Sequence, residues 1–416
     1  MLQIFIKKLL LGFLAIFFFC IIFFPQLYSI PKLFLLIIIL LLQVITLNIN
    51  RKIYSVVILK WFYFYISFYL IWILLGFFNQ NPGSLDSFRL QIIWPVLYFI
   101  LITNINNIKI IENIFHLLFI ASISISIYNI YKFLEIILPL PHLFEFEQDF
   151  AIGIHSGYIE IASLNIGSLT FLMPFVLTVL LLGNDFWKKI NMKKRFVFIT
   201  FLLCIVTVII SGRRALWFTA ILTFFIYKLF FFFYNKSKTN LKPRNFKINN
   251  FFILFFVIGL FTILSNYIDK DNFINRITSE FDTSNTTVRQ LQAKALINGF
   301  KEHFIFGTGF GLGVKDVIRN PERPWTYELT YHLYLYNVGI VGFFIFVLLL
   351  IFPIFISLKY IISKSNFLLL PFYISYLMVL FASSSNPYFT SSFDFEWMLF
   401  LPIGILNCLE ITKQQT

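Results

Sequence analysis

The stretch Ile209-Ile210-Ser211-Gly212-Arg213-Arg214-Ala215-Leu216-Trp217 places two adjacent arginines between apolar runs that are each long enough to enter a membrane. A guanidinium at membrane depth costs about 2.5–3.5 kcal/mol even on a lenient insertion scale, so such residues usually face a cavity and serve a function. Arginine stays charged, and its planar fork matches the oxygens of a phosphate group. The stretch therefore predicts a turn between two membrane helices that holds an anionic ligand, phosphate above all, at the membrane surface.

The composition of the whole chain agrees with a membrane protein. Hydrophobic residues make up 59% and charged residues 12% of the 416 residues, and the mean hydropathy is +0.85. Soluble domains carry about twice that share of charged residues. A helix needs about 20 residues to cross a bilayer, so we predict an all-α integral membrane protein with about twelve spans. The predicted spans are 6–24, 32–48, 53–78, 88–103, 110–138, 165–182, 196–212, 215–234, 251–267, 329–358, 366–383 and 397–412.

Clusters of lysine and arginine orient these spans, because cytoplasmic loops are enriched in both residues. The loop 183–195 carries five basic residues and one acid, and the loop 235–250 carries five basic residues and no acid. Together with Lys7-Lys8 they predict that both termini are cytoplasmic. The net charge of +14 is therefore mostly topogenic. It does not indicate nucleic-acid binding, because the basic clusters flank spans and do not alternate with aromatics on a soluble face.

The segment 268–328 is the longest stretch with the composition of a soluble protein, and it holds eight basic and eight acidic residues. We expect this extracytoplasmic loop, which contains short helices, to carry the chemistry, because functional residues concentrate on loops. The predicted organisation is an N-terminal bundle of about nine spans (1–267), the catalytic loop (268–328) and C-terminal spans (329–416), all in one membrane-embedded domain. The acidic loop 139–164 is expected on the same side, either as a second wall of the cavity or as a solvated lid.

Residues 287–300 predict an amphipathic helix within this loop, with Leu291, Ala295 and Phe300 packed inward. Arg289 lies in its first turn, where a cation opposes the helix dipole. An anionic ligand therefore explains Arg289 better than helix stability does. The alternative is a surface arginine paired with Asp282 or Glu280, and the local sequence does not decide between the two.

The glycine-rich segment Gly307-Thr308-Gly309-Phe310-Gly311 follows this helix. Alternate glycines let a backbone approach a ligand closely and present amide donors. Gly307, Gly309 and Gly311 are therefore candidates for a substrate-binding loop. A hinge between the loop helix and the membrane is the alternative, and the run does not follow a strand as a dinucleotide-binding loop would.

Residues 325–332 are predicted to open the next span, with Trp325 and Tyr327 as candidate sugar contacts. Glu328 and His332 are four residues apart, so they would lie on one face of that helix at its outer end. Such a pair can accept the proton of a hydroxyl nucleophile. Each also has a structural explanation, since an acid in a first turn stabilises a helix and a histidine can bond a neighbouring helix. Combined with the three arginines named above, the pair favours a functional interpretation.

The sequence contains no motif of paired carboxylates that would hold a metal-bound nucleotide sugar, and no Walker A loop. Its three cysteines, Cys20, Cys204 and Cys408, lie in separate predicted spans, too scattered for a metal site. We therefore expect an enzyme without metal or cofactor, whose donor is activated by a group other than a nucleotide.

Taken together, these segments resemble the O-antigen ligase and O-antigen polymerase superfamily, multi-span bacterial glycosyltransferases that use undecaprenyl-diphosphate-linked glycans. The resemblance is strongest over about 205–345. The turn at 211–216 is similar to the family's arginine turn, with Arg214 the closer match. Residues 300–311 are similar to the family's helix-to-glycine segment, and 334–342 to the helix after its catalytic position.

One departure from the family pattern bears on the activity. Family ligases usually have His-Asn eleven residues before the glycine that matches Gly339, where this chain has Glu328-Leu329. The resemblance therefore implies a repeat-unit polymerase in preference to a lipid A-core ligase. His332 lies one helical turn further on, so either Glu328 or His332 takes the role of the base.

The resemblance also implies a GT-C-like fold and inverting, metal-independent transfer at the outer face of the bacterial cytoplasmic membrane. Arg213 or Arg214 would bind the diphosphate together with Arg289 and stabilise the charge that develops as it leaves. The implied partners are the undecaprenyl-diphosphate-linked oligosaccharide donor, a glycan acceptor and membrane lipids, with a chain-length regulator and a flippase as partner proteins.

Two other functions share these features. A ligase would use the same site with another acceptor, such as lipid A-core. A transporter or flippase would use the arginines as a latch, but such proteins tend to show internal symmetry and polar residues through both leaflets. In this chain the ionisable residues concentrate on one predicted side, which favours an enzyme.

Overall fold

The computed structural model describes residues 2–46, 53–138, 140–141, 143, 151–155, 158–237, 288–364, 366–388 and 392–415. Their regular structure is helical apart from one hairpin, in which β1 (Ala151–His155) pairs antiparallel with β2 (Tyr158–Ala162). The hairpin falls in the loop 139–164, for which the sequence predicted no strands. The predicted helical class is therefore confirmed, with this one local addition.

Eight helices among the described residues are long and apolar enough to cross a membrane, which confirms the prediction of a multi-pass membrane protein at that level. Three more predicted spans correspond to helices of 16 or 17 residues, which are Ile166–Leu182, Lys194–Ile210 and Phe367–Ala382. The predicted span 251–267 lies outside the described residues. The full-length helices are Leu2–Phe23, Ser29–Thr46, Val56–Phe78, Ser84–Asn104, Ile108–Glu135, Arg214–Tyr234, Thr330–Ser363 and Phe393–Thr412.

The chain divides into two compact units that are discontinuous in sequence. Unit 1 comprises Met1–Ile114, Thr286–Leu369 and Val379–Thr416, and unit 2 comprises Phe115–Asn285 and Leu370–Met378. The helices α6 (Ile108–Ile137) and α15 (Leu370–Ala382) each contribute to both units. The whole described part of the predicted catalytic loop, residues 288–328, belongs to unit 1, together with the N-terminal and C-terminal helices. The predicted division at 267/268 lies outside the described residues and stays a prediction.

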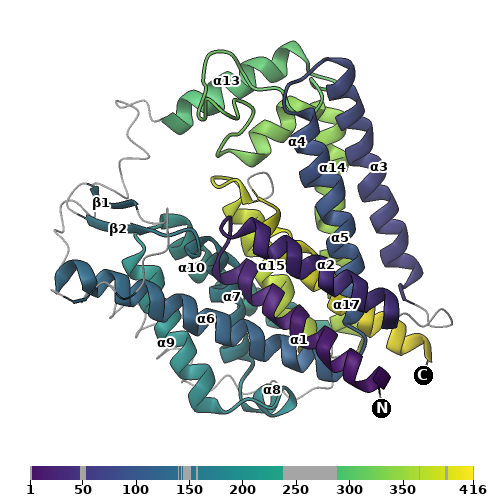
Figure 1. Ribbon diagram of the computed structural model, residues 1–416, viewed down its shortest axis with the longest axis vertical. Helices are drawn as coiled ribbons and strands as arrows, with labels where there is room; N and C mark the ends of the chain where they lie inside the picture. The colour runs from purple at the N-terminus through teal and green to yellow at the C-terminus, as the bar shows by residue number, and fades with distance from the viewer. Residues whose placement is uncertain are drawn as a thin grey trace. The chain divides into compact units, whose positions relative to one another are not determined.

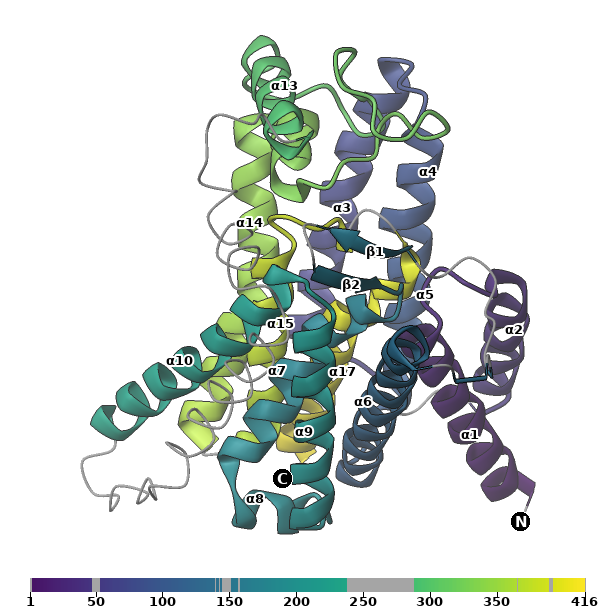
Figure 2. The ribbon, with the colours of Figure 1, turned by 90° about the vertical axis from the view of Figure 1, so that its left-hand side faces the viewer.

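Unit 2 is organised around a fully buried helix. Every residue of α7 (Ile166–Leu182) is buried, and the helix packs against α9 (Lys194–Ile210) and α10 (Arg214–Ser237). The short α8 (Asn184–Lys189) turns the chain from α7 to α9, as Figure 2 shows. Gly183 begins this turn with a φ of 79°, a conformation that costs glycine little.

In unit 1, α3, the α4–α5 segment and α14 lie side by side, and α13 lies against the end of α14 (Figure 1). The α4–α5 segment contains one π-helical turn directly before Pro95, which lacks the amide needed to continue an α-helical ladder. The helix α1 forms a hairpin with α2. The elements of this unit are α1 (Leu2–Phe23), α2 (Ser29–Thr46), α3 (Val56–Phe78), α4 (Ser84–Phe88), η1 (Arg89–Ile93), α5 (Trp94–Leu101), η2 (Ile102–Asn104), α13 (Val288–Glu302), α14 (Thr330–Lys364), η3 (Phe367–Leu369), η4 (Phe393–Phe395) and α17 (Trp397–Gln415).

Aromatic side chains join α3 to α14 in the interior of unit 1. The hydroxyl groups of Tyr69 and Tyr334 lie 3.0 Å apart and share a hydrogen bond. The ring of Tyr334 stacks on Phe346, and the ring of Tyr69 stacks on Phe310 from the loop. Buried tyrosines normally pair their hydroxyl groups in this way, because an unpaired hydroxyl is costly away from water. The loop after α13 is therefore part of the packed interior.

Candidate functional site

The helix α13 places Arg289 in its first turn, as the sequence predicted. Its buried face, however, consists of Gln292 and Leu296, while Leu291 is 45% exposed. The prediction of Leu291 as an inward-facing residue is therefore wrong by one position, about 100° around the helix. It failed because a polar residue, Gln292, occupies the buried face, whereas the prediction followed apolar residues only.

The loop between α13 and α14 is held by a buried tyrosine. The hydroxyl of Tyr327 accepts a hydrogen bond from the Val314 amide at 2.8 Å and donates to the Val317 carbonyl at 3.0 Å. Burial raises the pKa of this hydroxyl, and the hydrogen bond from Val314 partly opposes the shift. Because its ring is fully buried against Leu296, Tyr327 has no exposed face for a sugar in this structure. It fixes the path of the loop directly before Glu328.

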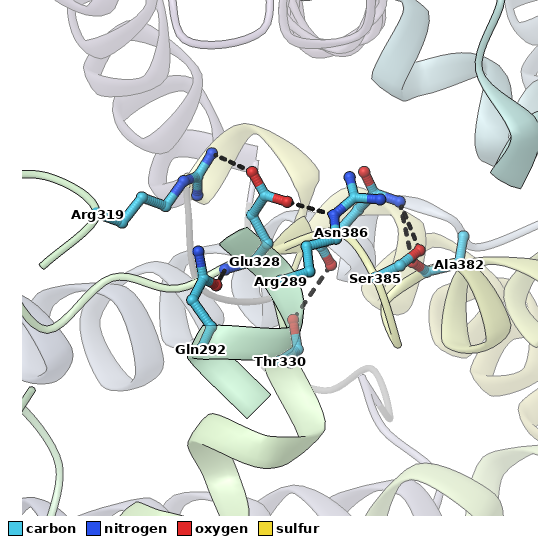
Figure 3. A network of polar contacts seen from close by, with 8 residues as sticks. All are labelled: Arg289, Gln292, Arg319, Glu328, Thr330, Ala382, Ser385 and Asn386. Atoms are coloured by element: carbon cyan, nitrogen blue, oxygen red, sulfur yellow. Dashed lines mark hydrogen bonds and ion pairs between the residues drawn. The ribbon is translucent and has the colours of Figure 1, made fainter. Parts of the chain in front are cut away.

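Glu328 brings two arginines together. Its Oε2 lies 2.6 Å from Nε of Arg289, and its Oε1 lies 3.2 Å from Nη2 of Arg319 (Figure 3). Its backbone amide donates to Oε1 of Gln292 at 3.2 Å. The side chains are partly exposed, at 44% for Arg289, 39% for Arg319 and 25% for Glu328. Among the described residues, the cluster is therefore a solvent-accessible group of two cations in contact with one carboxylate.

The predicted stacking of Glu328 on His332 within one helix is wrong. The helix α14 begins at Thr330, so Glu328 lies two residues before it, in a bend. The Thr330 amide bonds to the Glu328 carbonyl at 3.1 Å, and the Glu328 side chain contacts Arg289 of α13. His332 lies in the first turn of α14, half-buried, and its Nδ1 has no hydrogen-bond partner among the described residues. The two candidate bases thus occupy different surroundings.

A polar segment after α15, which the sequence analysis left unassigned, frames this cluster. The Thr330 hydroxyl donates to the Asn386 carbonyl at 3.2 Å, and the Asn386 side chain donates to the Ala382 carbonyl and to the Ser385 hydroxyl (Figure 3). The only sequence signal for it was the run of small polar residues that ends the apolar helix. Arg319 was also missed, because it is one of eight basic residues in the loop and no motif marks it.

The glycine segment inserts into a break in α14. Gly339 has a φ of 66° inside α14, and the amide of Ile340 bonds to the Phe304 carbonyl at 2.9 Å instead of continuing the helix. In return, the Gly309 amide donates to the Asn337 carbonyl at 2.8 Å. At Gly307, which has a φ of 70°, a Cβ atom would lie 2.4 Å from the Asn337 backbone. Close backbone packing therefore explains Gly307 and Gly309, and the amides of both donate inside the protein.

Gly311 and Trp325 pack against the turn between α3 and α4. The Gly311 carbonyl accepts from the Gly83 amide at 2.9 Å, and the Trp325 ring covers Gly83 so closely that a Cβ atom there would lie 2.4 Å from it. A cavity of about 40 Å³ beside Trp325 and Asn337 has room for a water molecule but not for a sugar ring. Sugar contacts of Gly311 and Trp325 stay a prediction.

Arg213 lies in the turn between α9 and α10, and Arg214 is the first residue of α10, so the predicted turn between two helices is present. Gly212 has a φ of 65°, and the Arg213 amide donates to the Ser211 hydroxyl at 3.3 Å. Both arginines are half-buried. They belong to unit 2, whereas Arg289, Arg319 and Glu328 belong to unit 1. Of the predicted site residues, the structure therefore brings Arg289 and Glu328 into direct contact.

Within the described parts of the chain, no three histidine, cysteine, aspartate or glutamate side chains gather closely enough to hold a metal ion. No protein-family model matches the chain, and no curated protein matches it in sequence. The residues around Glu328 are therefore the main indication of what this protein does.

Proposed function

We propose that this protein is a membrane glycosyltransferase that joins oligosaccharide repeat units carried on undecaprenyl diphosphate into a cell-surface polysaccharide. The observation that supports the proposal is the cluster of Arg289, Arg319 and Glu328 directly before an apolar helix of spanning length. A lipid diphosphate has a charged and an apolar part in the same way. Its head group needs cations, and its tail needs apolar helices. The proposed location is the outer face of the bacterial cytoplasmic membrane, with both termini in the cytoplasm.

In the proposed reaction, a hydroxyl of the acceptor glycan attacks the anomeric carbon of the donor. The bond from that carbon to the diphosphate oxygen breaks, the electron pair leaves with the diphosphate, and the configuration inverts. Arg289, together with Arg213 or Arg214, stabilises the negative charge that develops on the leaving group, as preorganised cations do in a partly dry site. Arg289 belongs to unit 1 and Arg213 and Arg214 to unit 2, and their joint role is part of the proposal.

The proton of the attacking hydroxyl passes to Glu328 or His332. Both oxygens of Glu328 contact guanidinium groups, so opening of one ion pair would favour access of the attacking hydroxyl to Glu328. His332 needs no such step, and its buried Nδ1 has no partner among the described residues. The two candidates therefore differ in whether base activity depends on ligand binding.

The test is to replace the chromosomal copy with variants and to resolve the surface polysaccharide by length. Arg289→Ala should abolish chain extension, while the protein remains in the membrane at normal abundance. Arg323→Ala is the matched control, because Arg323 comes from the same loop and is 4.0 Å from Asp86, away from Glu328. Polysaccharide of normal length from the Arg289→Ala cells would rule out the proposed role.

The joint role of these arginines is tested by cross-linking. Cysteines introduced at 214 and 289 should form a cross-link with a short reagent of about 10 Å and should react with a membrane-impermeant thiol reagent from outside the cell. Labelling only after the membrane is made permeable would place the arginines on the wrong side and contradict the proposal.

A further inference from the structure

We infer that Arg289, Arg319 and Gln292 form a cradle for a phosphate-type anion, and that Glu328 occupies this cradle until the anion binds. The inference rests on the proposed function and deepens it, because it names the chemical group that this cluster recognises and adds two residues to its recognition. It also gives Glu328 a second role besides that of a candidate base.

The first observation is that two cations converge on one carboxylate from different elements. Arg289 projects from α13, and Arg319 projects from the loop after it, yet both contact Glu328 at 2.6 and 3.2 Å. Two guanidinium groups repel each other unless an anion lies between them. A carboxylate and a phosphate present oxygens of the same kind to such groups. Glu328 therefore stands where an oxygen-rich anion would bind.

The second observation is independent of the ion pairs and concerns Gln292, which is 1% exposed. Its Oε1 accepts from the Glu328 amide, which fixes the orientation of the carboxamide, since only the oxygen can accept. Its Nε2 is buried and has no hydrogen-bond partner among the described residues. Figure 3 shows this nitrogen pointing to the side where the head groups of Arg319 and Glu328 lie. A buried donor left without an acceptor is unfavourable, and an oxygen of an incoming anion would satisfy it.

The exposure of the cluster allows this exchange. All three charged side chains are between 25% and 44% exposed, and ion pairs in contact with solvent are weak because water competes for both partners. An anion with two negative charges can displace a carboxylate with one without disturbing the packed interior around Tyr327. Displacement also frees the Glu328 oxygens from the two guanidinium groups, which leaves them open to the attacking hydroxyl of the acceptor.

The experiment measures anion binding by calorimetry with the purified full-length protein in detergent. The probes are inorganic pyrophosphate and farnesyl diphosphate, with farnesol as the uncharged control. Arg319→Gln should weaken the binding of both diphosphates about tenfold, because it removes one charge-assisted hydrogen bond. Glu328→Gln should strengthen binding by a similar factor of about ten, because it removes the competing carboxylate. Arg323→Gln, with the same loss of charge in the same loop, should change the dissociation constant less than about twofold.

Arg319→Lys is the second variant at this position, because it keeps the charge and loses the fork, and it should fall between the wild type and Arg319→Gln. Tighter binding of farnesyl diphosphate than of pyrophosphate assigns the cradle to a lipid head group, and equal binding assigns it to a free diphosphate. Unchanged binding in Arg319→Gln, or weaker binding in Glu328→Gln, overturns the inference.

These outcomes are separate from those of the proposed function. Suppose that diphosphate binding changes as expected in these variants, but that cells with Arg289→Ala make polysaccharide of normal length. This result would overturn the polymerase proposal and leave the cradle in place. Suppose instead that the protein polymerises glycan, but that Arg319→Gln binds diphosphate as tightly as the wild type does. This result would overturn the cradle alone.

Discussion

Unit 1 contains two kinds of ion pair, and they differ in burial. Lys32 and Asp394 lie 2.9 Å apart with side-chain exposures of 3% and 0%. Arg289 and Glu328 lie 2.6 Å apart, but they are 44% and 25% exposed. The buried pair is saturated by neighbours, since Asp394 also accepts from the Gln26 amide at 2.6 Å and Lys32 also donates to the Phe24 carbonyl at 2.5 Å.

The comparison shows that burial, and not distance, separates a structural ion pair from one that can exchange its partner. Removing one member of a buried pair leaves an uncompensated charge, whereas an exposed charge can return to water. We therefore expect Lys32–Asp394 to hold the α1–α2 hairpin to η4, and the pairs around Glu328 to be available to a ligand. The predictions below test this separation.

The largest expected effect is on stability at the buried pair. Asp394→Ala should lower the free energy of unfolding by about 3–5 kcal/mol, because Lys32 would remain charged and buried without its partner. Thermal unfolding in detergent, followed by circular dichroism, measures the change. The double variant Lys32→Met/Asp394→Leu should recover most of the loss. A single variant as stable as the wild type would remove the basis of the comparison.

The next effect is on activity at the exposed pair. If Glu328 is the base, Glu328→Gln should reduce the rate of glycan extension by about 10²-fold or more, while His332→Ala leaves most of it. If His332 is the base, the two results exchange. Extension rates with lipid-linked repeat units in proteoliposomes distinguish them. Full activity in both single variants and in the double variant would exclude both residues.

An intermediate effect is expected where the backbone supports the site. Gly307→Ala should destabilise the protein by about 1–3 kcal/mol, because the residue has a φ of 70° and its Cβ atom would lie 2.4 Å from the Asn337 backbone. Gly12→Ala is the control, since a Cβ atom there meets nothing within 4 Å. Equal unfolding temperatures for both variants would show that the glycine segment is not held as the structure has it.

The smallest expected effect is on stability at the exposed cluster, and it tests the difference between the buried and the exposed ion pair directly. Glu328→Gln should change the free energy of unfolding by less than about 1 kcal/mol, in contrast to Asp394→Ala, because both arginines can return to water. Raising the salt concentration to 0.5 M should weaken diphosphate binding at the exposed cluster through screening. The same salt concentration should leave the loss of unfolding free energy in Asp394→Ala unchanged. A loss of several kcal/mol in Glu328→Gln would make the exposed cluster structural.

Some features of the helix α13 were predicted from the sequence and others were not. The position of Arg289 in the first turn of a helix was predicted correctly, because helix boundaries depend on local sequence. The buried face of that helix was not, because Gln292 is buried against the Glu328 amide, a contact made across the loop. The predicted span 329–358 begins within one residue of α14, which starts at Thr330. The hydrogen bond from the Thr330 hydroxyl to Asn386, 56 residues further along the chain, left no signal in the local sequence.

From its amino-acid sequence alone, this chain could be recognised as a helical protein of the membrane, because hydropathy acts over windows of about 20 neighbouring residues and needs no knowledge of the fold. The partners of Glu328 and Lys32 were decided only by tertiary structure. Glu328 meets an arginine 39 residues away, and Lys32 meets an acid 362 residues away. Such pairs form where packed helices and loops bring distant segments together, and the path of those segments depends on the side-chain packing of the whole unit.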